Sequence, residues 1–123
     1  MAWELKSDRP IYTQLSDYIK LGIISGKYLP GDKLPSVRDL AEEASVNPNT
    51  MQKALVELER LGMVYTQRTS GRFITEDEEM IKKLKQSVAK QQITEFFEAM
   101  KKLGFSMEET IQLVEKEGRE LTV

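Results

Sequence analysis

Apolar residues recur at helical spacing near the start of the chain. Four of them lie four positions apart: Ile11, Leu15, Ile19 and Ile23. They form one stripe of an amphipathic helix and predict a helix over residues 11–25. Pro10 suits its first turn, because the N–H that proline lacks would have no partner there. Gly26 is placed to end the helix.

Two shorter helices are predicted next, separated by a tight turn. Ser36 is placed to cap the first, with Asp39 as a weaker capping-box partner. Asn47 and Pro48 suit the N-cap and the first residue of the second, which Gly62 closes. The residues expected to face the core are Leu40, Ala41, Ala44, Met51, Ala54, Leu55, Leu58 and Leu61. Two helices joined in this way form a helix-turn-helix.

The period of the pattern then changes. Residues 63–67 are β-branched and aromatic, residues 68–71 are typical of a turn, and residues 72–75 form a second short strand. Together they predict a β-hairpin. Three helices followed by a hairpin, in this order, predict a winged helix-turn-helix.

An acidic run then opens a helical tail. Thr75 and Glu78 are spaced as a capping box, and acidic side chains suit the positive end of a helix dipole. The apolar pattern predicts a long helix to about Leu103. Ser106 and Glu109 form a second capping box, which predicts a last helix after it. The expected fold class is therefore mainly α with a small β-hairpin.

The amino-acid composition excludes several kinds of binding and catalytic site. The 18 basic and 20 acidic residues give a net charge of −2, so any binding to nucleic acid must come from a local basic patch. Cysteine and histidine are absent, which removes disulfides, thiol nucleophiles, the usual zinc sites and Ser-His-Asp catalysis. We therefore expect no catalytic residues, no metal site and no cofactor.

Polar residues gather at the start of the second helix of the helix-turn-helix. They are Asn47, Asn49, Thr50, Gln52 and Lys53. Their amide, hydroxyl and ammonium groups can reach base edges or phosphates in a major groove. In the alternative interpretation, Asn47 and Thr50 only cap the helix, while Gln52 and Lys53 lie on a solvated face.

Two further groups flank this helix. Ser36 and Arg38 open the preceding helix, where exposed N–H groups suit a phosphate. The alternative for Arg38 is an ion pair with Glu42. The hairpin tip carries Arg68, Ser70, Gly71 and Arg72. Such a wing can lie along the minor groove or the backbone of DNA, and the alternative is an ordinary charged turn.

The tail carries more apolar side chains than two helices can cover by themselves. The residues expected at an interface between two copies are Ile81, Leu84, Val88, Phe96, Phe97 and Met100. Left exposed, they would form a larger patch than soluble monomers usually tolerate. We therefore expect a homodimer, with packing of the tail against the head as the alternative. The resulting interpretation is a winged helix-turn-helix DNA-binding domain at residues 9–77 and a helical dimerisation tail at residues 78–123.

No apolar run reaches the ~18–20 residues that cross a bilayer, and the N-terminus shows no signal-peptide pattern. We therefore expect a cytoplasmic protein without a membrane partner.

Over about residues 9–76 the chain resembles the GntR family of bacterial transcription regulators. The most specific part is the string Pro-Gly-Asp-Lys-Leu-Pro-Ser at residues 30–36, which runs into Arg38. Further matches lie at residues 10–15, 28–41, 46–50, 53–55 and 58–59 and in the hairpin. The short tail is similar to that of the YtrA-like branch, because the larger effector domains of other branches cannot fit after Thr75.

The resemblance implies a homodimeric winged helix that binds a palindromic operator, usually as a repressor. It implies DNA-contacting roles for Arg38, Asn47, Asn49, Thr50, Gln52 and the wing from Arg68 to Gly71. Thr69 stands where the family's wing has the first of two glycines, so the backbone of the tip can differ there. Members of this branch often lie beside transporter genes.

Three alternatives remain beside a repressor of its own gene and of transporter genes. A winged helix can bind proteins instead of DNA, although the polar recognition helix favours DNA. A small-molecule effector of unknown identity could bind in the helical tail. An enzyme is disfavoured, because the chain shows no pairing of a nucleophile with a base and no metal set.

Overall fold

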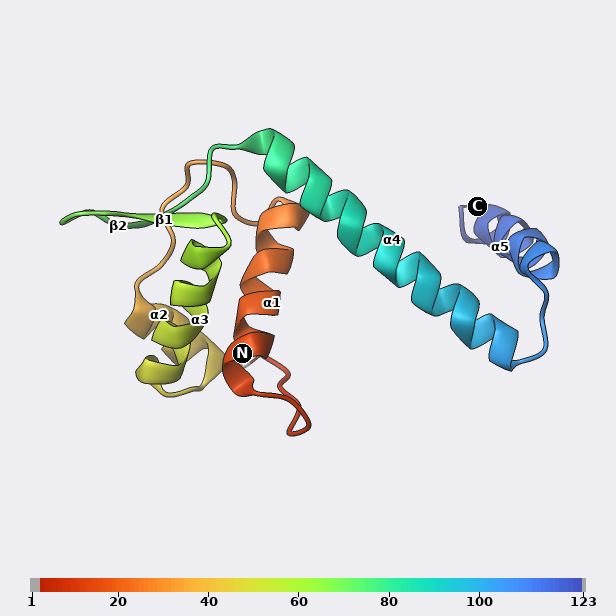
Figure 1. Cartoon of the computed structure of the whole chain (residues 1–123), viewed down its shortest axis with the longest axis horizontal. Helices are drawn as coiled ribbons and strands as arrows, with labels where there is room; N and C mark the ends of the chain where they lie inside the picture. The colour runs from red at the N-terminus through yellow and green to blue at the C-terminus, as the bar shows by residue number, and fades with distance from the viewer. Residues whose placement is uncertain (1–2, 123) are drawn as a thin grey trace. The chain divides into compact units, whose positions relative to one another are not determined.

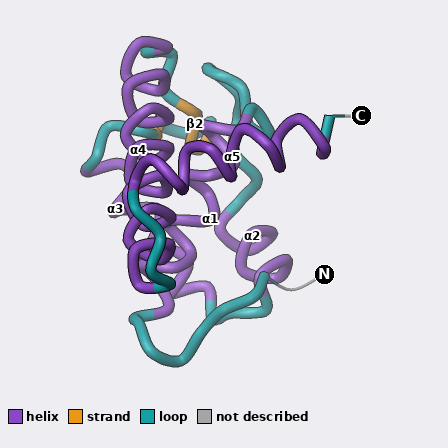
Figure 2. The backbone as a smooth tube through the Cα atoms, turned by 90° about the vertical axis from the view of Figure 1, so that its right-hand side faces the viewer, coloured by secondary structure: helices purple, strands orange, loops and turns teal. Residues whose placement is uncertain are grey.

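The computed structural model describes residues 3–122, which form five helices and a two-stranded hairpin (Figure 1). The elements are α1 (Ile11–Ser25), α2 (Val37–Ala44), α3 (Pro48–Arg60), β1 (Val64–Gln67), β2 (Gly71–Ile74), α4 (Glu78–Lys102) and α5 (Met107–Leu121). The tube in Figure 2 shows that helices dominate and that the strands are confined to the hairpin. The expected fold class, a mainly helical chain with a winged helix-turn-helix and two C-terminal helices, is confirmed.

The chain divides into two compact units, which we call the head unit, up to Lys85, and the tail unit, from Gln86 onward. This division falls inside α4. The sequence analysis placed its domain boundary between residues 77 and 78, before the first residue of α4, and that boundary stays a prediction.

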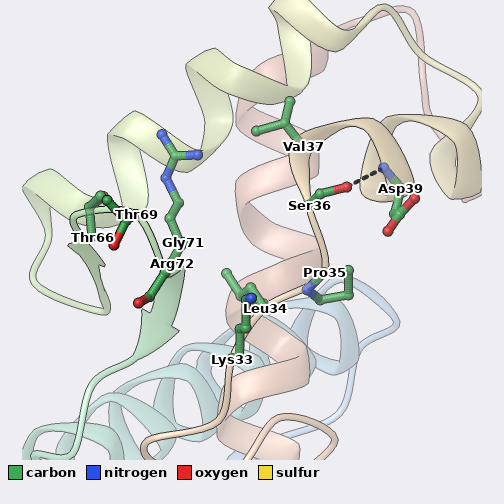
Figure 3. A pocket seen from close by; sticks show the side chains of 11 residues that line it. Lys33, Leu34, Pro35, Ser36, Val37, Asp39, Thr66, Thr69, Gly71 and Arg72 are labelled. Atoms are coloured by element: carbon green, nitrogen blue, oxygen red, sulfur yellow. Dashed lines mark hydrogen bonds between the residues drawn. The ribbon is translucent and has the colours of Figure 1, made fainter.

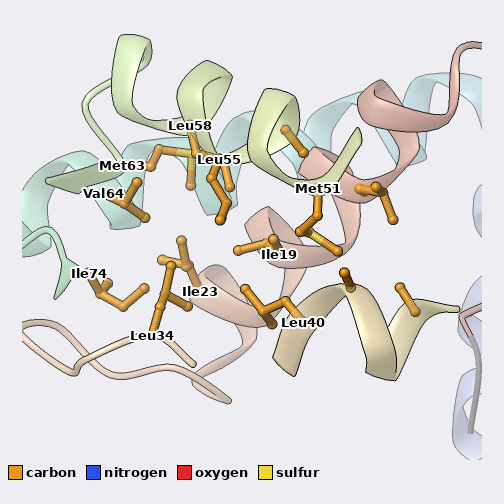
Figure 4. Packing of buried hydrophobic residues seen from close by; sticks show 14 residues of the cluster. Ile19, Ile23, Leu34, Leu40, Met51, Leu55, Leu58, Met63, Val64 and Ile74 are labelled. Carbon is orange, nitrogen blue, oxygen red and sulfur yellow. The ribbon is translucent and has the colours of Figure 1, made fainter. Parts of the chain in front are cut away.

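The core of the head unit lies between α1, α2, α3 and the hairpin (Figure 4). Its largest fully buried apolar side chains are Leu15, Ile19, Leu40, Met51, Leu55, Leu58, Met63 and Ile74. The predicted stripe of α1 is confirmed, with Ile11 partly buried at its end. Leu61 was expected in the core but is 40% exposed. The reason is that Gly62 turns the chain with φ +79, so that Met63 takes the buried place instead.

The ends of the first three helices follow the predicted chemistry closely. The Ser36 hydroxyl accepts a hydrogen bond from the Asp39 amide at 3.1 Å, and the Asn47 side chain accepts one from the Asn49 amide at 2.7 Å. Gly26 ends α1 in the left-handed conformation, with φ +90. Pro10 is the N-cap of α1 and lies one residue before the helix rather than in its first turn.

The segment before α2 extends the hairpin into a small sheet. The strands pair antiparallel, with Val64 opposite Ile74, and Lys33 forms an antiparallel bridge with Phe73. The Leu34 amide donates to the Arg72 carbonyl at 2.9 Å, and the Ile74 amide donates to the Asp32 carbonyl at 2.8 Å. The loop that leads into the helix-turn-helix is therefore hydrogen-bonded to the wing.

Side chains of α1 hold the N-terminal arm. The Gln14 side chain is buried, and its amide accepts from the Lys6 N–H at 2.6 Å and donates to the Lys6 carbonyl at 2.7 Å. Trp3 stacks on Tyr18 with the ring centroids 5.0 Å apart. The Tyr18 hydroxyl also accepts from the Glu4 N–H at 3.0 Å and donates to the Glu4 carbonyl at 3.1 Å, so Gln14 and Tyr18 together fix the arm along α1.

The expected capping box at the start of α4 is wrong by two residues. Asp77 caps the helix, because its carboxylate accepts from the Met80 amide at 3.0 Å. Thr75 does not form the predicted box with Glu78, since its amide donates to the Met63 carbonyl at 2.9 Å instead of to the Glu78 carboxylate and holds Thr75 beside the hairpin. Its hydroxyl accepts from the Asp77 amide instead.

In the tail unit, the predicted capping box of α5 is confirmed. Ser106 accepts from the Glu109 amide, and the Glu109 carboxylate accepts from the Ser106 amide at 2.9 Å. Gly104 ends α4 with φ +97. Many large apolar side chains of this unit remain between 43% and 84% exposed: Ile93, Phe96, Leu103, Met107, Ile111, Val114 and Leu121.

Within residues 3–122, none of the helices is long and apolar enough to span a bilayer. The same residues contain no group of three or more acidic side chains arranged to hold a metal ion.

Candidate nucleic-acid interface

The first part of the candidate interface is the start of α3. Met51 and Ala54 are fully buried, which turns the opposite side of the helix to solvent. Asn49, Gln52 and Lys53 are exposed on that side, while Thr50 is partly buried. The Oδ1 atom of Asn47 accepts the capping hydrogen bond from the Asn49 amide. The amide N–H groups of the Asn47 side chain have no partner within residues 3–122. The helix thus presents amides and an ammonium group where a recognition helix needs hydrogen-bonding groups.

The second part is the start of α2. Ser36 and Arg38 are both exposed there. The ion pair between Arg38 and Glu42, which the helical spacing allows, is not formed, and Arg38 has no ion pair within residues 3–122. Its guanidinium group is therefore available for an anionic partner.

Lys53 has a neighbour that sequence reasoning missed. Its ammonium group lies 4.1 Å from the centroid of the Tyr12 ring, at the start of α1. A cation over an aromatic face is attracted to it by about 0.5–1 kcal/mol at an exposed site. Tyr12 therefore restrains the Lys53 side chain on the exposed side of α3 without neutralising its charge.

The third part is the wing tip, Arg68–Thr69–Ser70, with Gly71 beginning β2. Arg68, Ser70 and Gly71 are exposed. Thr69 has φ +66, in the left-handed region that favours glycine. Thr69 therefore adopts a glycine-like backbone in spite of its side chain. Gly71 has φ +108, and a Cβ added there would meet Lys33 Cε at 3.2 Å.

Arg72 is held more firmly than an ordinary wing residue. Its Nε donates to Glu59 Oε1 at 2.5 Å, and the Thr66 hydroxyl donates to the same oxygen at 2.5 Å. The Arg72 side chain is only 18% exposed. Glu59 was not among the predicted site residues. The helical spacing of α3 gave no signal for it, because its partners lie on the hairpin.

The same hydrogen bonds alter the acidity of Glu59. The hydrogen bond from Thr66 has the largest effect and lowers the pKa of the Glu59 carboxyl; burial, the next largest, raises it, and the hydrogen bond and positive charge of Arg72 lower it further, so that the net shift is downward. The carboxylate is therefore charged at neutral pH and compensates one of the positive charges of the wing.

A cleft of about 760 Å³ lies between the wing and the start of α2. Figure 3 shows Lys33 and Ser36 on the α2 side and Thr69 and Arg72 on the wing side. The Arg72 side chain runs from β2 toward α3 in this view. The head unit thus brings the start of α2 and the wing, which the sequence separates, around one cleft with a basic group on each side, Lys33 and Arg72.

The residues expected at a dimer interface fall into two groups. Ile81 and Leu84 are partly buried against the core of the head unit. Val88, Phe97 and Met100 are partly buried, and Phe96 is exposed, in the tail unit. The tail unit also holds a cavity of about 290 Å³, lined by residues that include Phe97, Phe105 and Thr110.

Comparisons with known sequences match this arrangement. A family model described as bacterial regulatory proteins, gntR family, matches residues 11–74. The uncharacterized HTH-type transcriptional regulator YhcF of Bacillus subtilis is 42% identical over 109 residues, which cover 89% of this chain and 90% of YhcF. The HTH-type transcriptional repressor YtrA of the same species is 47% identical over 72 residues, which cover 58% of this chain and 55% of YtrA.

Solved structures give the same result in three dimensions. A GntR family transcriptional regulator from Listeria monocytogenes superposes with a TM-score of 0.83 at 43% identity, over 91% of this chain and 98% of that one. A structure of AraR(DBD) in complex with an operator superposes with a TM-score of 0.54 at 29% identity, over 61% of this chain and 92% of that one.

Proposed function

The chain belongs to the GntR family and is a transcriptional regulator with a DNA-binding helix-turn-helix; from this premise we propose that it acts as a homodimeric repressor of a palindromic operator. The observation that carries the DNA-binding part is the exposed polar start of α3 between two basic groups, Arg38 and the wing. A similar domain, AraR(DBD), has been solved on an operator, and the related YtrA is named a repressor.

In this proposal, α3 enters the major groove of DNA. The base-reading residues are Asn49, Thr50 and Gln52 near its N-terminus, because this end of a recognition helix meets the base edges. Asn47 and Lys53 lie beside them and reach bases or phosphates. The proposed backbone contacts are Ser36, Arg38, Arg68, Ser70, Gly71 and Arg72. Backbone contacts set affinity and salt dependence, whereas base contacts set sequence choice.

The proposed dimer rests on the exposed apolar side chains of the tail unit. Phe96, Leu103 and Met107 are 43%, 71% and 63% exposed. Transfer of apolar surface out of water stabilises association by roughly 25 cal/mol per Å² before the costs of association. Two recognition helices about 34–36 Å apart would then read inverted half-sites, and a dimer bound over a promoter would exclude polymerase.

The proposal is tested by fluorescence anisotropy on the DNA upstream of the gene for this chain and on random DNA, at two salt concentrations. Specific affinities exceed nonspecific ones by about 10³ or more, so a gap of that size with one dimer per site is expected. Equal, weak and salt-sensitive binding would rule out an operator in this DNA and leave transporter genes as the next targets to test. No binding to either DNA at low salt would favour a protein-interaction module.

Two substitutions separate the proposed roles in this assay. Arg38→Ala is expected to weaken binding to all sequences about equally, because it removes a phosphate contact. Gln52→Ala is expected to lower the preference for the operator by roughly tenfold, since one good base contact contributes about 1–3 kcal/mol of discrimination. Lys82→Ala removes a positive charge from exposed α4 and serves as a control that should change neither quantity. Equal effects of Arg38→Ala and Gln52→Ala on both DNAs would contradict this division.

The tail cavity favours a second candidate function, a repressor gated by a small ligand. Its lining includes the apolar Phe97, Phe105 and Met107 together with Glu98 and Lys101. A compound that raises the Tm and lowers operator affinity, and that loses both effects in Phe97→Ala, would establish it. A screen in which no Tm rise depends on Phe97 would speak against an effector in this cavity.

A further inference from the structure

One carboxylate connects the end of α3 to both strands of the wing. Glu59 Oε1 accepts the Thr66 hydroxyl of β1 and the Arg72 Nε of β2, both at 2.5 Å. Thr66 and Arg72 are direct cross-strand partners, one step from the last pair before the tip. A single acceptor therefore fixes the outer part of the hairpin to the helix that carries the recognition residues.

The hydrogen bond to Glu59 leaves most of the Arg72 guanidinium group available. Arginine has five N–H donors, and only the one on Nε is used here. Within residues 3–122 the two terminal amino groups have no hydrogen-bond partner. Because the Nε bond restricts the rotation of the side chain, these amino groups are held in one orientation beside the cleft that Lys33 and Ser36 also line.

The charge of Glu59 alone would oppose DNA binding. A carboxylate close to phosphates repels them, by roughly 1 kcal/mol at 4 Å in water and more near a protein surface. Glu57, two residues earlier on α3, pairs with Arg60 on the same helix and does not contact the wing. The two carboxylates carry the same charge, but only Glu59 connects α3 to the hairpin.

We propose that Glu59 is a positioning residue for DNA binding, which fixes the wing relative to α3 and presents the terminal amino groups of Arg72 to the DNA backbone. This inference rests on the proposed function, because it assigns a role in binding to a residue that does not contact DNA. Arg72 has two roles in it, one toward Glu59 and one toward a phosphate.

The test compares three variants with a matched control. Glu59→Gln removes the charge and keeps an oxygen acceptor, Glu59→Ala removes both, and Arg72→Ala removes the side chain that Glu59 orients. Glu57→Ala is the control, because it removes a carboxylate from the same helix without touching the wing. The DNA probes are a duplex enriched from a random pool by the wild-type chain and a duplex of the same composition in scrambled order.

A role of Glu59 through its charge and a role through its position predict opposite effects of Glu59→Ala on DNA affinity. If Glu59 positions the wing, Glu59→Ala weakens binding to both duplexes by roughly tenfold, which corresponds to the loss of one charge-assisted hydrogen bond to the DNA backbone. Glu59→Gln, which keeps an acceptor for Arg72, binds both duplexes within about threefold of the wild type. In the Arg72→Ala background, Glu59→Ala no longer weakens binding, because the two residues act as a unit. Glu57→Ala does not weaken binding to either duplex.

A readout on the free protein separates this inference from the proposed function. The Arg72 Nε–H resonance is expected to exchange slowly with solvent in the wild type and in Glu57→Ala, and rapidly in Glu59→Ala. Failure to enrich any duplex would contradict sequence-specific binding, whereas rapid exchange in the wild type would overturn the positioning role. Tighter binding of Glu59→Ala to both duplexes would also overturn it. If Glu59→Ala does not fold, Thr66→Val removes one donor to Glu59 while keeping a β-branched residue in the strand, and a smaller loss of affinity for both duplexes is expected.

Discussion

At the scale of single residues, several polar groups proposed to contact DNA already have a partner within the chain. Asn47 caps α3, Lys53 lies over the Tyr12 ring, and Arg72 is bonded to Glu59. Each partner uses only part of the group, so hydrogen-bonding capacity remains on its outer side. Fixing such side chains before binding reduces the entropy lost when they meet DNA.

The backbone of the wing tip gives a prediction about stability. Thr69 is β-branched and has φ +66, a conformation that glycine adopts at no steric cost. Thr69→Gly is expected to raise the free energy of unfolding by about 0.5–1 kcal/mol, because relief of about 1–2 kcal/mol of strain exceeds the added entropy of the unfolded chain. Urea denaturation measures it. Ser70→Gly, at the next position, where φ is not positive, should destabilise the fold, and an equal gain from both changes would contradict the explanation.

The lowered pKa of Glu59 predicts how its contribution depends on pH. The hydrogen bonds from Thr66 and Arg72 stabilise the charged form in the folded state, so the folded pKa lies below the unfolded one. The contribution is therefore fully present above about pH 4.3, the ordinary pKa of glutamate, and is lost as the pH falls through the lowered folded value. The difference in unfolding free energy between the wild type and Glu59→Gln should be constant from pH 7 to about pH 5 and shrink below. A difference that grows in acid would contradict this sign.

At the scale of elements, the position at which a helix begins depends on local caps and on hydrogen bonds to other elements. Ser36, Asn47 and Ser106 cap their helices as their local sequences indicate. Thr75 has an equally suitable side chain, but its amide is hydrogen-bonded to Met63 across the base of the hairpin. A tertiary hydrogen bond has moved the start of α4 to the next suitable cap, Asp77.

This shift predicts an asymmetry between two neighbouring acidic residues. Asp77→Ala is expected to lower the free energy of unfolding by about 0.5–2 kcal/mol, because the Met80 amide loses its acceptor. Glu78→Ala should cost only about 0.3 kcal/mol, the loss of a charge near the positive end of the helix dipole. Thermal denaturation of the two variants compares them. The reverse order of stability would support the capping box formed by Thr75 and Glu78.

At the scale of the whole molecule, the two units differ in how they use apolar residues. The head unit has a closed core of fully buried side chains. No described residue of α4 is fully buried, and several apolar side chains of the tail unit are mostly exposed. An apolar surface of this kind is typical of a region that meets another copy of the chain.

The proposed dimer is tested by placing a charge on this surface. Phe96→Lys is expected to raise the dissociation constant of the dimer by at least tenfold, because burying one phenylalanine contributes about 1.5–3 kcal/mol. Gln91→Lys is the control, since 3.6 residues per turn place it on the opposite side of α4. Sedimentation equilibrium measures both. A wild type that remains monomeric at all concentrations would contradict the proposed dimer, as would equal dissociation constants for the two variants.

The sequence by itself determined the order of the elements, most helix ends and the identity of the fold. These features depend on local chemistry: the four-residue spacing in α1, the caps Ser36 and Asn47, and the left-handed glycines that end helices. The polar start of α3 could be read for the same reason, because burial of Met51 and Ala54 on one side exposes the other.

Only the tertiary structure decided which residues from distant segments meet. It paired Lys33 with Phe73, moved the start of α4 to Asp77, exposed Leu61 and joined Glu59 to Thr66 and Arg72. The contacts of Lys33 with Phe73 and of Glu59 with Thr66 and Arg72 link positions 7 to 40 residues apart, and no period in the sequence encodes them. They depend on how the hairpin packs against the helices, which is set by the burial of the whole core rather than by any local pattern.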